Sequence, residues 1–202
     1  MCGRYTSNTE DEVIQIRSIL AGLTMRLAGE ILEESSILNV DSLTGKEIFP
    51  SNSAPIITNK GKLTLSKFGF EKWDGSGLII NARSETAGDS RYFSPYNLKS
   101  RCIIPASNYF EWKKTPGSYS EKYKIAFGNK SGIFMAGFLD PKVNIESFVI
   151  LTKPASENIS FIHDRMPVLL SQTQLIPWLN GSLDISRLSL LNISDIPFEK
   201  AV

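Results

Sequence analysis

The stretch RCIIPASNYFEW, residues 101–112, contains an apolar run at residues 102–104 and an aromatic-rich segment at residues 108–112, which predict neighbouring β-strands. Asn59-Lys60-Gly61-Lys62 has the composition of a turn between two further strand-like segments. Many short strands at close spacing predict an α+β fold built on an antiparallel or mixed, barrel-like sheet with peripheral helices. The other strand-like segments lie at residues 56–58, 63–70, 78–80, 124–127, 133–138 and 147–152.

Helices are expected near both ends of the chain. After an extended start at residues 2–6, Thr9-Glu10-Asp11-Glu12 has the form of a capping box and begins a helix with Val13, Ile16 and Leu20 at helical spacing. No internal repeat, low-complexity stretch or linker interrupts the chain, so we expect one domain over residues 1–202. The remaining helical patterns cover residues 24–34, 156–161 and 171–179.

The composition is that of an ordinary globular protein, because 42% of the 202 residues are hydrophobic, enough for one sizeable core. No segment has the character of a signal peptide or a membrane span, so we expect a cytoplasmic monomer that does not contact membranes. Cys2, Cys102 and His163 are the only cysteines and the only histidine, which excludes a disulfide framework and a usual structural zinc site. Cys102 lies in an apolar run and is expected to be a buried thiol. Without a Rossmann or P-loop glycine pattern, no cofactor is expected.

Charge is unevenly distributed along the chain, although the net charge is only +1. Residues 51–130 hold 13 Lys and Arg against 6 Asp and Glu, whereas the segments on either side are net acidic. A positive face beside aromatic side chains suits contacts with phosphates and stacking on nucleobases. Taken singly, however, each aromatic residue is more often part of a core and each lysine a solvated surface group. The aromatic candidates are Phe68, Phe70, Trp73, Tyr92, Phe93, Tyr109, Phe110 and Trp112.

Cys2 is the residue with the most specific chemistry in the chain. Removal of Met1 would leave an amine and a thiol on adjacent carbons, with reference pKa values of about 8 and about 8.5. The amine condenses with an aldehyde to an imine, and the thiol then closes on the same carbon to give a thiazolidine ring. A cysteine near the start of a strand is more often a small apolar residue, so the rest of the chain decides between the two interpretations.

Polar groups that an N-terminal cysteine would need occur in four further segments, of which the rigid loop at residues 50–55 could shape a groove but is a weak signal by itself. Asn81 and Arg83 follow the apolar residues 78–80, where Asn81 can orient a substrate and Arg83 can pair with a phosphate; the alternative is a surface turn. Glu111 lies between two aromatic residues, where desolvation would raise its pKa and suit it to proton transfer, but strand alternation would equally turn it to water. His163 is followed by two charged residues and then a Met-Pro turn, which favours a cleft position, although a lone histidine is more often structural.

In their order along the chain, these segments resemble the SRAP family (SOS-response-associated peptidase domain). Each motif alone could occur by chance, but five motifs in this order, starting from a cysteine at position 2, are specific for the family. In that family the mature N-terminal cysteine attacks the ring-opened sugar aldehyde of an abasic site and forms a thiazolidine crosslink. The resemblance therefore implies that the partner is single-stranded DNA containing abasic sites. The motifs span most of the chain and read MCGRY at 1–5, PSNSAP at 50–55, NARSET at 81–86, RCIIPASNYFEW at 101–112 and HDRMP at 163–167.

The resemblance also implies a role for each matching residue. Cys2 is the nucleophile through both its amine and its thiol, and Asn81 positions the N-terminus and the sugar. Glu111 moves protons during imine formation and crosslink reversal, and His163 bonds the sugar oxygen and aids ring opening. The implied DNA contacts are made by Arg4 and Arg83 with flanking phosphates and by Thr152 in the pocket.

One stretch departs from the family pattern. Family members carry a Trp-Gly motif and a further tryptophan before the Asn-Ala-Arg segment, whereas residues 68–73 here read FGFEKW and a short link follows. The side chain that stacks on the base next to the lesion (the stacking wedge) would then be Lys72, Trp73 or Phe68, of which Trp73 is our candidate for DNA binding. In addition, the α-amine of Cys2 is an amide until Met1 is removed, either by an aminopeptidase or by the chain itself.

Two other functions would use the same residues. A cysteine peptidase or N-terminal-nucleophile hydrolase would combine Cys2 with His163 and with Asn81 or Glu111, and it would turn over peptides instead of forming a stoichiometric crosslink. A non-enzymatic single-strand binder would leave Cys2 incidental, so that the Cys2→Ala variant would keep all activity.

Overall fold

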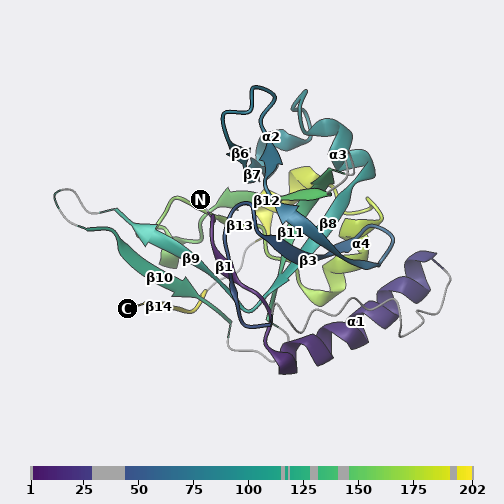
Figure 1. Cartoon of the computed structure of the whole chain (residues 1–202), viewed down its shortest axis with the longest axis horizontal. Coiled ribbons are helices and arrows are strands. Elements are labelled where there is room, and N and C mark those ends of the chain that lie inside the picture. The colour runs from purple at the N-terminus through teal and green to yellow at the C-terminus, as the bar shows by residue number, and fades with distance from the viewer. Residues whose placement is uncertain are drawn as a thin grey trace.

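In the computed structural model, the strands form two main sheets and a small ribbon (Figure 1). The structure describes residues 2–28, 44–114, 117, 119–127, 132–140, 146–191 and 195–201. The first sheet contains β3 (Ser53–Thr58), β4 (Leu63–Phe68), β7 (Asn81–Arg83), β8 (Arg101–Ala106), β11 (Ile133–Asp140), β12 (Ser147–Pro154) and β13 (Arg165–Pro167). The second sheet contains β1 (Tyr5–Thr6), β2 (Glu47–Ile48), β9 (Asn108–Lys113), β10 (Glu121–Ile125) and β14 (Phe198–Lys200). The ribbon pairs β5 (Phe70–Glu71) with β6 (Leu78–Ile79).

Five strands of the first sheet close into a ring. Pairing runs from β11 through β8, β3 and β4 to β12, and β12 pairs back onto β11. Gly137 lies in β11 where it pairs with Cys102 of β8 and with Ile150 of β12. A Cβ atom at residue 137 would lie 2.5 Å from the carbonyl oxygen of Val149, so the strands approach this closely only because the residue is glycine. The ring confirms the predicted barrel-like α+β fold.

The two strands predicted within residues 101–112 are β8 and β9, and they belong to different sheets. Every side chain of β8 is buried, because β3 and β11 flank it inside the ring. Pro105 is tolerated in this inner strand because β3 pairs only with Cys102 and Ile103, so the proline lies beyond that ladder. After Ser107 the chain leaves the ring and enters the second sheet as β9.

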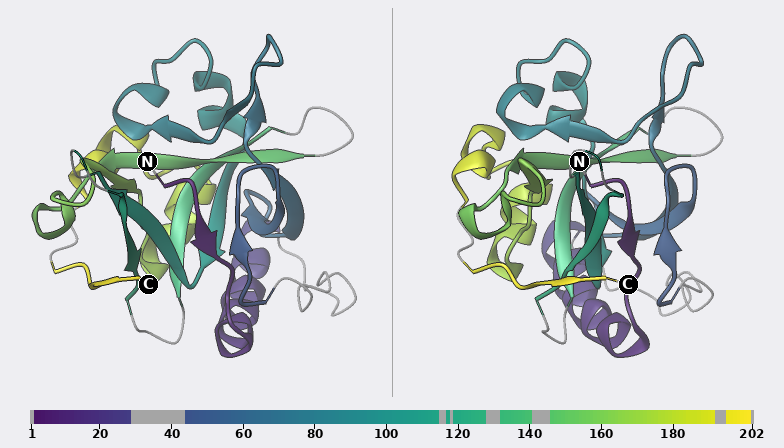
Figure 2. Two further views of the ribbon diagram at one scale, coloured as in Figure 1. Left: turned by 60° about the vertical axis from the view of Figure 1, so that its left-hand side comes forward. Right: turned by 90° about the vertical axis from the view of Figure 1, so that its left-hand side faces the viewer.

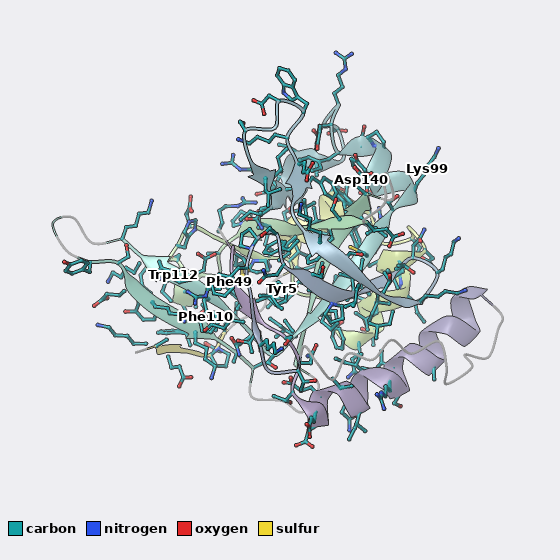
Figure 3. All side chains as sticks on the ribbon, in the orientation of Figure 1. Tyr5, Phe49, Lys99, Phe110, Trp112 and Asp140 are labelled. Carbon is teal, nitrogen blue, oxygen red and sulfur yellow. The ribbon has the colours of Figure 1, made fainter. Side chains whose placement is uncertain are left out.

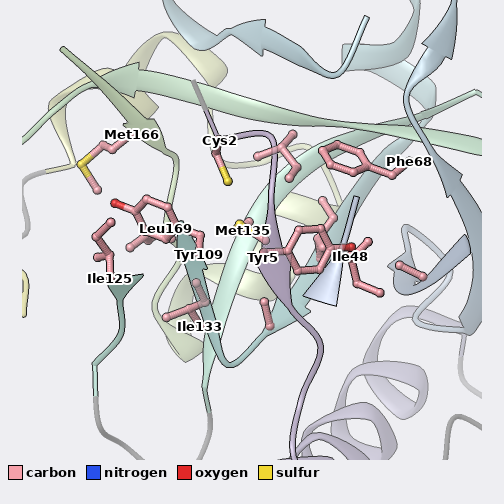
Figure 4. Close-up of a cluster of buried hydrophobic side chains, with 14 of the residues drawn as sticks. Cys2, Tyr5, Ile48, Phe68, Tyr109, Ile125, Ile133, Met135, Met166 and Leu169 are labelled. Atoms are coloured by element: carbon pink, nitrogen blue, oxygen red, sulfur yellow. The ribbon is translucent and has the colours of Figure 1, made fainter. Parts of the chain in front are cut away.

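Two clusters of buried side chains hold the sheets together. The first fills the space between the ring and the second sheet and includes Tyr5, Phe68 and Tyr109 (Figure 4). The second lies on the other side of the ring and includes Trp178, whose Nε1 donates a hydrogen bond to the carbonyl oxygen of Cys102 at 2.9 Å. Burial of side chains of this size contributes about 1.5–3 kcal/mol each. Cys102 is a buried thiol, as predicted.

The helices lie outside the sheets (Figure 1). The turned views show a layer that contains α2 and α3 along one side of β12, with the other strands of the ring on the other side of β12 (Figure 2). No helix among the described residues is both long and apolar enough to cross a membrane. The α-helices are α1 (Glu10–Ala28), α2 (Ser84–Ala87), α3 (Ser94–Lys99) and α4 (Leu175–Leu179), and the 3-10 helices are η3 (Glu157–Ile159), η4 (Gln172–Gln174) and η5 (Ile185–Leu190).

The first helix begins as the sequence predicts. The backbone N–H of Thr9 donates to the Glu12 carboxylate at 2.8 Å, and the N–H of Glu12 donates to Thr9 Oγ1 at 3.4 Å, which is the expected capping box. The prediction of a separate helix from residue 24 is wrong as far as Ala28, because α1 continues through it. Residues 29–34 of that prediction lie outside the described part of the chain.

Other predictions of helices and strands are confirmed only in part. The helix predicted at residues 156–161 is a single 3-10 turn, η3, and the one at 171–179 is the turn η4 followed by the short α4. Such short helical segments are stable only through packing on the rest of the fold, which local sequence does not report. For the same reason α2, α3 and η5 were not predicted.

Candidate active site

Strand β12 positions two distant segments of the site. On one side β7 runs parallel to it, so that Asn81 pairs with Ile150 and Arg83 with Thr152. On the other side β13 runs antiparallel to it, with Thr152 opposite Pro167, and the loop before β13 carries His163. The motifs that begin at residues 81 and 163 are therefore held by one strand. The N-terminal end of the chain lies beside the same strand (Figure 2).

Asn81 ties the beginning of the chain to this strand. Pairing of Tyr5 with Tyr109 aligns β1 antiparallel to β9 and brings the first residues alongside Glu111. The Asn81 Nδ2 group then donates a hydrogen bond to the carbonyl oxygen of Cys2 at 3.1 Å and a longer one to that of Ile150 at 3.4 Å. Asn81 thus contacts the backbone of residue 2, the contact that its implied positioning role requires.

The Cys2 side chain is 0% exposed. Its sulfur points into the first buried cluster, toward Met135 and between Tyr5 and Tyr109 (Figure 4). Burial raises the pKa of the Cys2 thiol well above its ordinary value, and the negative charge of Glu111 raises it further. The thiol is therefore protonated at neutral pH in this enclosed state.

Glu111 faces the interior of the molecule. The carboxylate side chain is only 4% exposed, and burial raises the pKa of Glu111 to about 7. Sequence alternation left two orientations open, and the structure selects the desolvated one. Glu111 lines a small recess together with Tyr109, His163 and Arg165, and the remaining walls of the recess are apolar. A carboxyl group with a pKa near neutrality can both donate and accept a proton.

His163 lies at the edge of the same recess. The backbone N–H of Arg165 donates to its Nδ1 at 2.9 Å, so in the neutral ring Nδ1 is the acceptor and Nε2 carries the proton. A carboxylate oxygen of Asp164 lies 2.8 Å from the same Nδ1 and would accept its proton if the ring became charged. Burial lowers the pKa of His163, which favours the neutral form and the contact with Arg165. The cleft position expected for this histidine is thus observed.

Arg165 and Glu85 were not singled out from the sequence, although both lie within the quoted motifs. The Arg165 guanidinium binds both carboxylate oxygens of Glu85. Its Nη2 also donates to the carbonyl oxygen of Thr152 at 2.8 Å and to Thr152 Oγ1 at 3.2 Å. Thr152 itself is fully buried, so its implied contact with DNA would have to act through Arg165. In the sequence, only their place within the motifs pointed to these two residues. Their ion pair could not be predicted, because they lie 80 positions apart.

The two arginines expected to bind phosphates have different surroundings. Arg83 is exposed at the end of β7. Arg4 forms an ion pair with Glu47, and its guanidinium lies 4.2 Å from the ring centre of Phe49 and 5.7 Å from that of Trp112. Phe49 and Trp112 lie near each other over the second sheet (Figure 3). A phosphate would therefore have to compete with the Glu47 carboxylate for Arg4.

Four of the eight aromatic residues considered for base stacking are buried in the core. Phe68 is fully buried and stacks on Phe148 with ring centres 5.1 Å apart, which rules it out as the stacking wedge. Phe70, Tyr109 and Phe110 are also buried. Trp73 is 95% exposed in the turn between β5 and β6, so it remains available for a ligand.

Metal ligands are not grouped in the part of the chain that the structure describes. No three His, Cys, Asp or Glu side chains there lie close enough together to hold a metal ion. The structure brings Asn81 into contact with Cys2, places Cys2 within the field of Glu111, and places Glu111 and His163 in one recess. The other predicted site residues do not contribute to the walls of that recess.

Comparison with known proteins identifies similar sequences over most of the chain. The model of the family described as SOS response associated peptidase (SRAP) matches residues 1–197. The abasic site processing protein YoqW of Bacillus subtilis (strain 168) is 28% identical over 199 residues, which cover 89% of this chain and 80% of that protein. The abasic site processing protein YedK of Escherichia coli (strain K12) is 37% identical over 115 residues, 55% of this chain and 51% of that protein.

Solved structures show that the fold is shared. A protein from Bacteroides thetaiotaomicron superposes with a TM-score of 0.77 at 20% identity, covering 98% of this chain and 91% of that chain. A phage-related protein from Bordetella bronchiseptica superposes with a TM-score of 0.71 at 18% identity, covering 99% and 94%. At these identities the likeness concerns the arrangement of the chain alone.

Proposed function

The chain belongs to the SOS response associated peptidase (SRAP) family, and on that premise we propose that it processes abasic sites in single-stranded DNA through Cys2. The names of the relatives support abasic sites as the substrate. The observation that carries the proposal is the hydrogen bond from Asn81 to the carbonyl oxygen of Cys2. This bond holds residue 2 next to Glu111, so that an amine and a thiol on residue 2 meet a proton donor and acceptor.

The proposed reaction balances without a cofactor or an oxidant. After Met1 is removed, the Cys2 amine adds to the C1′ aldehyde of the ring-opened sugar, and the hydroxyl group leaves as water to give an imine. The thiol then adds to the imine carbon: the C–S bond forms, the C=N electron pair moves to nitrogen, and the net transfer is of one proton from sulfur to nitrogen. The product is a thiazolidine, equal to protein plus DNA less one water.

Glu111 is the proposed proton shuttle in these steps. With its pKa near 7, the carboxyl group protonates the leaving hydroxyl in the first step, which leaves the imine protonated on nitrogen and Glu111 as an anion next to the Cys2 thiol. In the second step the anion takes the thiol proton as the C–S bond forms, so the ring nitrogen keeps its single proton and Glu111 is protonated again. The same two transfers in reverse would release the crosslink.

The other residues are proposed to bind the strand and open the sugar. His163, with its proton on Nε2, donates to the ring oxygen of the sugar and favours the aldehyde form. Arg83 and Arg4 bind the phosphates on either side of the lesion, the latter after exchange of Glu47 for phosphate. Trp73 stacks on a neighbouring base. Because the thiol and Glu111 are buried, a lesion held inside a duplex would not reach them, which supports a preference for single strands.

A cysteine peptidase would need surroundings that lower the pKa of the Cys2 thiol. Catalytic cysteines of peptidases have a lowered pKa, because the thiolate is the nucleophile. Here burial and the charge of Glu111 both raise the pKa of the Cys2 thiol. Ring closure on an imine needs only that the thiol loses its proton while the C–S bond forms. Burial of the thiol beside the charge of Glu111 therefore favours crosslinking over peptide hydrolysis.

The proposal is tested by mixing the protein, with loss of Met1 confirmed by mass spectrometry, with a single-stranded oligonucleotide that contains one abasic site. We expect a stoichiometric adduct that survives denaturation and leaves the strand intact. The Cys2→Ala variant keeps the α-amine but lacks the thiol, so its imine should proceed to β-elimination and strand cleavage. A variant that forms the same stable adduct, or a wild-type protein that forms none, would overturn the proposal.

A further inference from the structure

The orientation of His163 depends on where β13 begins. The ring nitrogen Nδ1 accepts the backbone N–H of Arg165, the first residue of that strand. Any shift of Arg165 would move or break this hydrogen bond. Without it, the Asp164 carboxylate oxygen 2.8 Å from the same Nδ1 would favour the other tautomer, with the proton on Nδ1.

The side chain of Arg165 is fixed on several sides. The side chain as a whole is only 12% exposed, and its guanidinium forms a two-pronged ion pair with Glu85, with Nη2 2.9 Å from one carboxylate oxygen. The same Nη2 group donates to both the carbonyl and the hydroxyl oxygen of Thr152. A planar guanidinium held by two carboxylate oxygens has little rotational freedom, so this geometry also constrains the backbone of residue 165.

Glu85 joins this network from a different part of the fold. It belongs to α2, directly after the β7 strand that carries Asn81. Hydrogen bonds from Arg165 lower the pKa of Glu85, so the carboxylate stays ionised and the ion pair persists at neutral pH. This ion pair links α2 to the start of β13. The segments that carry Asn81 and His163 are therefore connected by the ion pair as well as by their common neighbour β12.

We propose that Glu85 is a positioning residue that acts through Arg165 to hold His163 as the neutral tautomer with its proton on Nε2. The consequence for DNA rests on the proposed function, since that proton would bond the sugar oxygen. The tautomer itself does not depend on the substrate. If the ion pair between Glu85 and Arg165 served stability alone, weakening it would leave the tautomer of His163 unchanged.

His163 is the only histidine in the chain, which makes its tautomer directly measurable. We would label the protein with ¹⁵N and record two-bond ¹H–¹⁵N correlations of the imidazole at pH 8, where the ring is neutral. The wild type should show one pyrrole-type nitrogen at Nε2 and one pyridine-type nitrogen at Nδ1. Glu85→Gln removes the charge but keeps the size of residue 85, and its spectrum should move toward a mixture of the two tautomers.

The control is Glu199→Gln, which breaks an exposed ion pair with Lys124 in the second sheet. It should leave the imidazole spectrum and the crosslinking rate as in the wild type. Crosslinking by Glu85→Gln should be slower by between about 10- and 100-fold, the range expected when a reacting group loses its support. Glu85→Asp, which keeps the charge, should recover part of the rate and part of the wild-type tautomer signal.

An unchanged imidazole spectrum in a folded Glu85→Gln protein would overturn the proposal, whatever the rate. A shifted spectrum supports it even if the protein forms no adduct with abasic DNA, so the two proposals fail separately. Should Glu85→Gln lose its far-UV circular dichroism signal, Arg165→Lys gives the same reading, because it keeps the charge but loses the two-pronged contact. Retention of the wild-type tautomer in Arg165→Lys would then overturn the proposal.

Discussion

Replacing Glu111 with glutamine should make the protein more stable at alkaline pH while removing its proton shuttle. In the folded state burial raises the pKa of Glu111 from 4.5 to about 7. A difference of roughly 2.5 units corresponds to about 3 kcal/mol between the protonated and the ionised form at this buried position. Glutamine has nearly the same shape and no charge, so it avoids that cost.

The sign follows from proton binding. Between pH 4.5 and about 7 the folded protein holds a proton on Glu111 that the unfolded chain has lost, so the free energy of unfolding falls as pH rises through this window. Above pH 7 the full cost is present, and below pH 4.5 it vanishes. The Glu111→Gln variant should therefore match the wild type near pH 4.5 and exceed it by up to about 3 kcal/mol at pH 8.

Urea unfolding at several pH values between 4.5 and 8 measures this difference. For a chain of this size, about 3 kcal/mol corresponds to a rise in Tm of roughly 6–12 °C at pH 8. The exposed substitution Glu199→Gln is the control and should change the free energy of unfolding by less than about 1 kcal/mol at every pH. Equal stability of Glu111→Gln and wild type at pH 8 would refute the reasoning, because Glu111 would then not be desolvated.

Three further substitutions probe the site. Asn81→Ala removes the hydrogen bond to the Cys2 carbonyl oxygen and should lower the free energy of unfolding by about 1 kcal/mol and the crosslinking rate by about tenfold; an unchanged rate in gel assays would contradict the positioning role. Glu47→Gln frees Arg4 for phosphate and should tighten binding of a single-stranded oligonucleotide, with a salt slope steeper by about 0.7 in fluorescence anisotropy; weaker binding would show that Glu47 supports Arg4 instead. Trp73→Ala should leave Tm unchanged but weaken single-strand binding by about 1–3 kcal/mol, and equal affinity would remove Trp73 from the interface.

The parts of the fold that sequence predicted are those with local causes. The capping box at residues 9–12 and the turn at residues 59–62 each close within four or five residues, and both are confirmed. The strands around residues 101–112 are recognisable because runs of β-branched and aromatic side chains suit a buried strand. The sequence predicted a barrel-like sheet but not which strands close it, since closure depends on Gly137 pairing with both β8 and β12.

The parts that sequence did not predict depend on contacts between distant segments. Whether Glu111 faces water or the core is decided by the first buried cluster packing on one side of β9 while Lys122 covers Phe110 on the other. The pairing of Arg4 with Glu47 likewise exists only because β2 lies beside β1. Phe68 could not be distinguished from a surface aromatic residue until Phe148 was placed next to it.

The central claim is that both functional groups of Cys2 become bonded to the sugar, and alkylation of the denatured adduct tests it most directly. The chain has two cysteines, so the free protein should take up two alkyl groups, on Cys2 and Cys102. In a thiazolidine the Cys2 sulfur is already bonded to carbon, so the adduct should take up one group, on Cys102, and its unalkylated mass should equal protein plus DNA less one water. An adduct of that mass that takes up two alkyl groups would be a simple imine and would contradict the account.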